Sequence, residues 1–271
     1  MHSKLFQIGP LEIHSYGLML AISFLIGIYF SMYRARKQGI DPNKIIDLSV
    51  VIVISAIFGA RFLYVIFHLE EFKGHWLDTI NPFQSSGQIG IAGLTMLGGF
   101  VAAVIFGLLY LKIKKLPRLK IADIVMPAIG LGIFVTRIGC FLNGCCYGIP
   151  TDVPWAMVFP SDCPAGAQYV GQAIHPTQLY SSLYGLIIFG LLLFLERYKK
   201  FDGFLLYLFF ILYGISRFTV DFFRYYENSM VLFQLGDFSI SVNQGISIFM
   251  ILLGGTLIYI NMMRINNKKA L

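Results

Sequence analysis

The sequence predicts an all-α, polytopic membrane protein of about seven transmembrane helices, with the N-terminus outside and the C-terminus in the cytoplasm. Composition is the first reason, because 57% of the 271 residues are hydrophobic and only 13% are charged. This balance lies outside the range of soluble globular domains. Apolar stretches of roughly 20 residues, the length that spans a bilayer, recur along the chain. We therefore expect a single transmembrane domain over residues 1–271.

Each predicted helix corresponds to an apolar window long enough to cross the ~30 Å hydrocarbon core. The windows cover residues 16–33, 45–67, 89–111, 121–139, 177–195, 204–223 and 242–262. Two long connections, at about 68–88 and 140–176, fall on the same side of the membrane. Long connections in compact folds are often functional, so we expect substrates to bind on that side.

The placement of basic residues predicts the orientation. Most of the 21 lysines and arginines follow the first, third, fifth and seventh windows. Loops rich in lysine and arginine stay in the cytoplasm, so the two long connections and the N-terminus are expected outside. The formal net charge of +7 is thereby explained by topology, and a nucleic-acid partner is not needed.

Three arginines, Arg61, Arg137 and Arg217, lie inside apolar windows, in the half of each that faces outward. A charge inside a bilayer is costly unless it faces the protein interior, water or an anion. One interpretation is structural, with Arg217 paired to Asp221 to join helices. The other is a site with excess positive charge for an anion, most plausibly a lipid phosphate held by guanidinium groups.

The sixth window carries a polar stripe. Its members Tyr213, Arg217, Asp221 and Arg224 follow i, i+4, i+8, i+11 spacing, which places them on one face of a helix. We expect this face to line the anion site.

Other candidates have two interpretations each. Tyr16 opens the first window and is either an interfacial belt residue or part of the site. Gly98 and Gly99 indicate close helix packing or room for a ligand beside the backbone. His175 is a candidate acid or base at the expected depth, and Gln178 follows it in the first turn of the fifth window.

Cysteine usage does not predict a disulfide scaffold. The chain has four cysteines, at positions 140, 145, 146 and 163, too few and too clustered for one. The Cys145–Cys146 pair could be a redox pair, a metal site or small apolar filling. With no further Cys or His at ligand spacing, no metal and no cofactor are expected. Pairing with Cys140 or Cys163 stays open.

Several segments resemble, in order, the motifs of the prolipoprotein diacylglyceryl transferase family. The longest is Arg137-Ile-Gly-Cys-Phe-Leu-Asn-Gly-Cys-Cys-Tyr-Gly148. The others are Tyr16-Gly-Leu-Met, Gly59-Ala-Arg61, Asp123 with Pro127-Ala-Ile, Pro154-Trp-Ala-Met-Val-Phe159, His175-Pro-Thr-Gln-Leu-Tyr180, Arg217-Phe-x-x-Asp221-Phe-Phe-Arg224 and Asn243-Gln-Gly.

This resemblance implies a multi-pass enzyme of the bacterial plasma (inner) membrane, with its active site toward the outer leaflet. It would transfer a diacylglyceryl group from phosphatidylglycerol to the lipobox cysteine thiol of a prolipoprotein. The products would be a thioether and glycerol phosphate. The partners would be phosphatidylglycerol and the lipobox segment of the signal peptide. Two alternatives remain: a related transferase with a different acceptor, and a non-catalytic lipid-binding or thiol redox membrane protein.

The resemblance assigns roles residue by residue. Arg137 and Arg217 match the family's essential arginines, and Tyr16 matches a functional tyrosine. Together with the depth argument, this gives a catalytic set of Arg137, Arg217, Asp221, Tyr16 and His175. The expected substrate-binding set is Arg61, Asn143, Gly148, Gly98, Gly99, Tyr213, Arg224 and Gln178.

The chain also departs from the family pattern. Leu97 stands where the family has histidine, and Asp221 stands where it usually has glutamate. Cys140 and Cys145 replace an asparagine and an acidic residue of the signature. Because leucine cannot exchange protons, the function of the family histidine is expected to be either absent or moved to His175 or His14.

Overall fold

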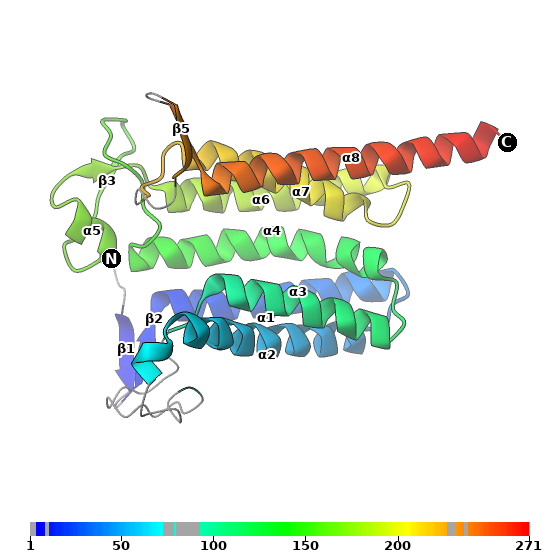
Figure 1. The fold of residues 1–271 in the computed structure, drawn as a ribbon, viewed down its shortest axis with the longest axis horizontal. Coiled ribbons are helices and arrows are strands. Elements are labelled where there is room, and N and C mark those ends of the chain that lie inside the picture. The colour runs from blue at the N-terminus through cyan, green and yellow to red at the C-terminus, as the bar shows by residue number, and fades with distance from the viewer. Residues whose placement is uncertain are drawn as a thin grey trace. The chain divides into compact units, whose positions relative to one another are not determined.

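The structure is a computed structural model that describes residues 4–8, 11–72, 79, 93–226, 231–235 and 238–270. Within these residues, seven helices are long and apolar enough to cross a membrane, which confirms the predicted all-α, multi-pass fold. They are α1 (Ser15–Lys37), α2 (Pro42–Phe67), α3 (Met96–Ile113), α4 (Arg118–Asn143), α6 (Thr177–Leu195), α7 (Phe204–Asp221) and α8 (Val242–Ala270) (Figure 1).

Short elements lie in the connections. Three sheets of two strands each are present in the described residues. Their strands are β1 (Lys4–Ile8) with β2 (Leu11–His14), β3 (Met157–Val158) with β4 (Ala173–Ile174), and β5 (Val231–Leu235) with β6 (Phe238–Ser241). The short helices are η1 (Leu69–Phe72), α5 (Pro164–Gln168) and η3 (Glu196–Tyr198). None of these short elements was predicted.

Several predicted window boundaries differ from the helix ends. The third helix begins at Met96 rather than at residue 89, because Gly93 has a φ of +77° and Thr95 is extended at the N-cap. The fourth helix continues past residue 139 to Asn143. Cys140 is therefore helical rather than part of a loop.

The chain divides into two compact units. Unit 1 contains residues 1–7, 12–30 and 122–271, and unit 2 contains residues 8–11 and 31–121. The expected single domain over the whole chain stays a prediction.

Unit 2 is built on direct packing of α2 against α3. A Cβ added to Gly98 would collide with the carbonyl oxygen of Gly59, and one added to Gly99 would lie 3.0 Å from that of Ala56. The two glycines therefore let the helix backbones touch, as small residues do in membrane helix pairs. The space beside them is filled by α2, which favours the packing interpretation of this pair.

In unit 1, α7 contacts both α6 and α8 (Figure 1). The buried carboxylate of Asp123, from α4, fixes the start of α7. It accepts hydrogen bonds from the backbone N–H groups of Gly203 (2.8 Å) and Leu206 (3.1 Å), and it pairs with Lys199 at 2.9 Å. An acidic side chain is favourable here because the first N–H groups of a helix lack partners within the helix.

The chain segments that follow α4 and α7 meet at one end of unit 1. Gly148 and Arg224 form an isolated antiparallel bridge. The Gly148 N–H also donates to the His175 carbonyl at 3.1 Å. A Cβ on Gly148 would lie 2.5 Å from that oxygen and 2.6 Å from the Phe223 oxygen, so only glycine fits. Gly148 thus joins three segments that carry predicted site residues.

Candidate functional site

A pocket in unit 1 is lined by both Arg137 and Arg217. It has about 310 Å³ of empty space, counting its open mouth. Residues from α4, α6 and α7 line it: Ile133, Arg137, Ser181, Tyr184, Gly185, Ile188, Tyr213, Ser216, Arg217 and Val220. Two guanidinium groups and several hydroxyls on apolar walls are the type of lining that holds an anionic headgroup.

Arg217 is paired within this site. Its Nη1 lies 3.2 Å from Oδ1 of Asp221, and its Nη2 donates to the Tyr226 hydroxyl. That hydroxyl donates in turn to Asp221 Oδ1 at 2.6 Å. The Ser241 hydroxyl donates to the other carboxylate oxygen. Asp221 is thus held from three sides and offsets the charge of Arg217.

Arg137 differs, because no carboxylate of the described residues forms an ion pair with it. The pocket therefore contains two guanidinium groups, only one of which is paired with a carboxylate. Tyr213, from α7, lines the same pocket and stacks on Phe209 with the ring centroids 5.6 Å apart. Because Arg137 has no carboxylate partner in the described residues, the pocket has positive charge for an anion to balance.

The predicted four-residue stripe on one helix is wrong at its last member. Helix α7 ends at Asp221, so Arg224 lies beyond it, in the bridge to Gly148. The Arg224 guanidinium lies 5.1 Å from the centroid of the Tyr226 ring, a cation–π distance. Arg224 therefore supports the network from the loop and does not extend the helical face.

His175 is buried just before α6 and is not among the residues that line the pocket. Its Nδ1 lies 3.1 Å from the Tyr180 hydroxyl, which accepts a hydrogen bond of 2.7 Å from Trp155 Nε1. Burial lowers the pKa of His175 below its usual value of 6.5. Its imidazole is therefore neutral at pH 7 and able to accept a proton.

Gln178 and Asn143, whose predicted role in substrate binding stays a prediction, both contact the cysteine segment. The Gln178 side-chain amide donates to the Cys145 carbonyl at 2.9 Å. Its other polar atom, Oε1, is buried without a hydrogen-bond partner. The Asn143 side chain interacts with the Cys145 thiol. Both residues thus position the turn that follows α4.

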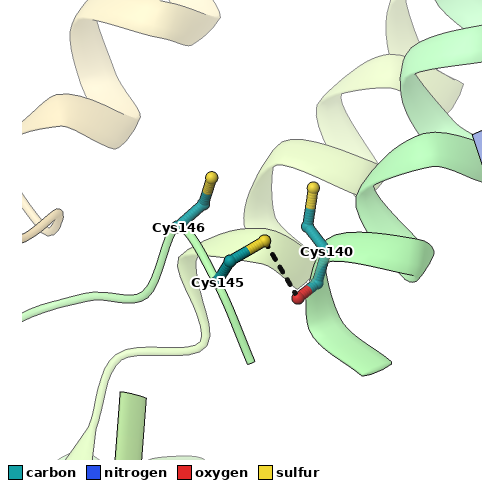
Figure 2. Close-up of side chains that lie close together, drawn as sticks. All are labelled: Cys140, Cys145 and Cys146. Carbon is teal, nitrogen blue, oxygen red and sulfur yellow. Dashed lines mark hydrogen bonds between the residues drawn. The ribbon is translucent and has the colours of Figure 1, made fainter. Parts of the chain in front are cut away.

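Three of the four free cysteines gather at this turn. The sulfur atoms of Cys140, Cys145 and Cys146 all lie within 4.8 Å of one another, and Figure 2 shows them turned toward a common space. Cys163 is separate, with its thiol donating to the Pro160 carbonyl at 3.1 Å. The sequence spacing predicts no third ligand beside Cys145 and Cys146, whereas the structure brings the Cys140 sulfur close to both.

Tyr16 and the charges around the cysteines complete this end of unit 1. Tyr16, in the first turn of α1, is near enough to Arg137 and to the three sulfur atoms to interact electrostatically with them. Hydrogen bonds from Cys140 and Cys145, together with the charges of Arg224 and Arg137, lower the pKa of Cys146. Tyr16 thus lies near Arg137, and its catalytic role stays a prediction.

Arg61 belongs to unit 2. It is buried there, and its guanidinium donates to the carbonyls of Thr79 (2.9 Å) and Gly93 (3.2 Å). It also packs 5.0 Å from the centroid of the Phe72 ring. Its assignment to the phosphate site stays a prediction, as do those of Gly98 and Gly99.

Two residues of the Asp221 network were missed by sequence reasoning. Tyr226 lies five residues beyond Asp221, past the end of α7, and Ser241 immediately precedes α8. Neither follows a helical spacing from the arginines, because Tyr226 lies in a loop and Ser241 ends β6. Only the folded chain brings them to Asp221.

Comparisons with known proteins agree with the motifs. A family model described as Prolipoprotein diacylglyceryl transferase matches residues 3–260. The phosphatidylglycerol–prolipoprotein diacylglyceryl transferase of Campylobacter hominis is 32% identical over 255 residues, covering 92% of this chain and 87% of the relative. The same enzyme from Clostridium tetani is 31% identical over 254 residues, covering 94% and 95%. That of Finegoldia magna is 36% identical over 217 residues, covering 80% and 81%. The chain therefore belongs to the prolipoprotein diacylglyceryl transferase family.

Proposed function

We propose that this protein transfers the diacylglyceryl group of phosphatidylglycerol to the lipobox cysteine thiol of a prolipoprotein. The observation that carries the proposal is the presence of Arg137 and Arg217 in one pocket of a chain that belongs to this family. In the reaction, a new S–C bond forms at the glyceryl carbon and its C–O bond to the phosphate breaks. Glycerol phosphate leaves, and the thiol proton passes to a base.

The two arginines would hold the phosphate and stabilise the charge of the leaving group. Arg137 has no carboxylate partner in the described residues, so its charge is available to a phosphate. Arg217 is held in one orientation by Asp221 and Tyr226. Donors fixed before the reaction stabilise developing negative charge without reorganising, and they act strongly in a site with little water.

His175 is the proposed proton acceptor. A cysteine thiol with a pKa of ~8.5 is mostly protonated at neutral pH and needs a base or a positive field to become a nucleophile. The neutral imidazole of His175 would supply the base, and the arginines would supply the positive field. Tyr16 would complete the catalytic set beside Arg137. Tyr213 would contact the lipid, and Arg224 would support the Asp221 network through Tyr226.

The proposed setting is the bacterial plasma (inner) membrane, with the site toward the outer leaflet. The support is the placement of basic residues, which predicts that the segments following α4 and α7 face outward. A secreted precursor anchored by its signal peptide would reach the site laterally through the bilayer.

The test is an assay of the purified chain with phosphatidylglycerol and a lipobox peptide. The peptide cysteine should gain the mass of a diacylglyceryl group. Loss of one preorganised donor slows catalysis by ~10²–10³-fold, so Arg137→Ala and Arg217→Ala should each be at least that slow. Arg217→Lys should also be poor, because a point charge cannot replace a planar fork. Arg264→Ala, at an exposed position near the end of α8, is the matched control.

Near-normal turnover in Arg137→Ala or Arg217→Ala would overturn the phosphate role. A related transferase with another acceptor is the second candidate, favoured by Leu97 in place of the family histidine. Growth of a strain depleted of its own transferase, restored by this chain, would exclude that candidate.

A further inference from the structure

The three clustered thiols come from two adjacent pieces of chain. Cys140 is in the last turn of α4, and Cys145 and Cys146 follow in the turn beyond it. The Cys145 N–H donates to the Cys140 carbonyl at 3.1 Å, and its thiol points to the same oxygen at 3.7 Å. The cluster is therefore local, and its geometry depends on one helix end and one turn within unit 1.

The sulfur positions match those around a small thiophilic cation. Zinc binds thiolates at about 2.3 Å, which places the sulfurs of a trigonal or tetrahedral site roughly 4 Å apart. All three sulfur–sulfur separations here are within 4.8 Å. A disulfide would bring two sulfurs to about 2 Å, and none of the four cysteines is in one. The cluster is near ligating geometry before any ion is added.

Neighbouring side chains hold the turn in place. Thr177 donates to the Cys146 carbonyl and Gln178 to the Cys145 carbonyl, each at 2.9 Å. Both side chains come from the first turn of α6 and are buried. Gly144, with a φ of +70°, begins the turn and packs on the Cys163 side chain. A ligand set supported by such contacts needs little rearrangement to bind.

Core packing alone does not explain these cysteines. Cys145 and Cys146 are only partly buried, so they are not simply filling apolar space. Cys146 also has a φ of +59°, in the left-handed region that residues with a side chain rarely adopt. Cys163, in contrast, is fully inside a small apolar cluster with Phe159 and Ile174.

We propose that Cys140, Cys145 and Cys146 form a three-thiolate binding site for a thiophilic divalent cation of the zinc class. Three protein ligands leave a fourth tetrahedral position for water or an external thiol, as in catalytic zinc sites. Hard cations such as Mg²⁺ prefer oxygen ligands and do not fit this set. The site is argued from the cluster alone and does not depend on the transfer reaction.

The test uses the full chain, purified in detergent, reduced and freed of metal. Cd²⁺ serves as the probe, because thiolate ligation gives a charge-transfer absorption in the ultraviolet. The signal should saturate at one ion per chain, and a large excess of Zn²⁺ but not of Mg²⁺ should displace it. Loss of a side chain that contacts a metal ligand, but not the metal, weakens metal binding by ~10–100-fold. Cys140→Ser, Cys145→Ser and Cys146→Ser each remove a ligand and should weaken binding by more than that.

Cys163→Ser is the matched control, since this thiol lies outside the cluster and should be dispensable for binding. A second measurement needs no variant: Zn²⁺ should protect Cys145 and Cys146 of the unaltered chain from alkylation, as read by peptide mass. Absence of a saturable signal, equal loss in Cys163→Ser, or no protection by Zn²⁺ would each overturn the proposal.

Discussion

Tyr226 contacts both partners of the Arg217–Asp221 pair. It accepts from the arginine and donates to the carboxylate. Burial raises the pKa of Tyr226, so its hydroxyl keeps its proton and remains a donor. The aromatic residue thus fixes the guanidinium that faces the pocket, although no pattern in the sequence pointed to it.

We predict that Tyr226→Phe slows the proposed transfer by about 10-fold or more. The substitution removes a hydrogen bond to charged groups, an interaction of ~1.5–3 kcal/mol, while preserving the ring. Steady-state rates with phosphatidylglycerol and lipobox peptide would measure the effect. Tyr225→Phe is the control, because Tyr225 stacks on Tyr147 and is outside the arginine network. Equal rates for the two variants would exclude a positioning role for Tyr226.

His175 gives a prediction about pH. Its pKa is lowered in the folded protein, so the unfolded chain, with a histidine pKa of ~6.5, binds the proton first as pH falls. Stability should therefore decrease as pH drops below ~6.5 and should stop decreasing below the lowered folded pKa. Melting curves from pH 7 to 5 would show this. His175→Gln should have a flatter profile, and an unchanged profile would contradict the assignment.

At the residue scale, sequence reasoning identified the candidate site residues whose charges are costly inside a membrane. An arginine inside an apolar window is visible because it breaks the window, and Arg137 and Arg217 do reach one pocket. Tyr226, Ser241 and the approach of Cys140 to Cys146 depend on how loops return after the helices. Such contacts leave no periodic signal.

Among the elements, the helix pair α2–α3 shows how glycines determine packing. The distances place Gly98 against the α2 backbone but leave Gly107 in ordinary contact, with an added Cβ 3.5 Å from Ile52. A Cβ at Gly98 must push the helices apart, whereas one at Gly107 fits.

We predict that Gly98→Ala destabilises the protein by ~1–3 kcal/mol through overpacking. Gly107→Ala, in the same helix, should be neutral or slightly stabilising, because alanine has the higher helix propensity. Thermal unfolding in detergent, followed by circular dichroism, compares the two variants. Equal melting temperatures would show that the close approach of α2 and α3 is not needed.

Element boundaries were less predictable than element identities. Hydrophobicity alone extended the third window to residue 89, although Gly93 and Thr95 delay the helix to Met96. The same reasoning extended α7 by two residues, so Arg224 was placed on a helix that it does not join. Helix ends depend on capping and backbone angles at single positions, and apolar windows do not record these.

On the scale of the whole molecule, composition and window length predicted seven membrane-spanning helices, and the described residues form seven helices long and apolar enough to cross a membrane. Orientation is a separate inference that rests on the distribution of lysine and arginine. That inference remains a prediction, because the helices themselves are compatible with either direction.

We predict that the C-terminus is cytoplasmic. Green fluorescent protein fused after Leu271 should fluoresce, because it folds in the cytoplasm. Alkaline phosphatase at the same position should be inactive, because it folds only outside the cytoplasm. Alkaline phosphatase inserted in the long connection near Val170, an exposed residue, should be active. The reverse pattern would place the anion pocket on the cytoplasmic side.

The backbone of Cys146 makes this turn less stable than it could be. At a φ of +59°, a Cβ crowds the backbone at roughly 1–2 kcal/mol, whereas glycine adopts this conformation freely. Cys146→Gly should therefore melt at a higher temperature than Cys146→Ala, since both lack the thiol and only alanine keeps the crowding. The opposite order would show that the turn is relaxed with a side chain. A cysteine at this position therefore lowers stability relative to glycine, a cost that its proposed role as a metal ligand would explain.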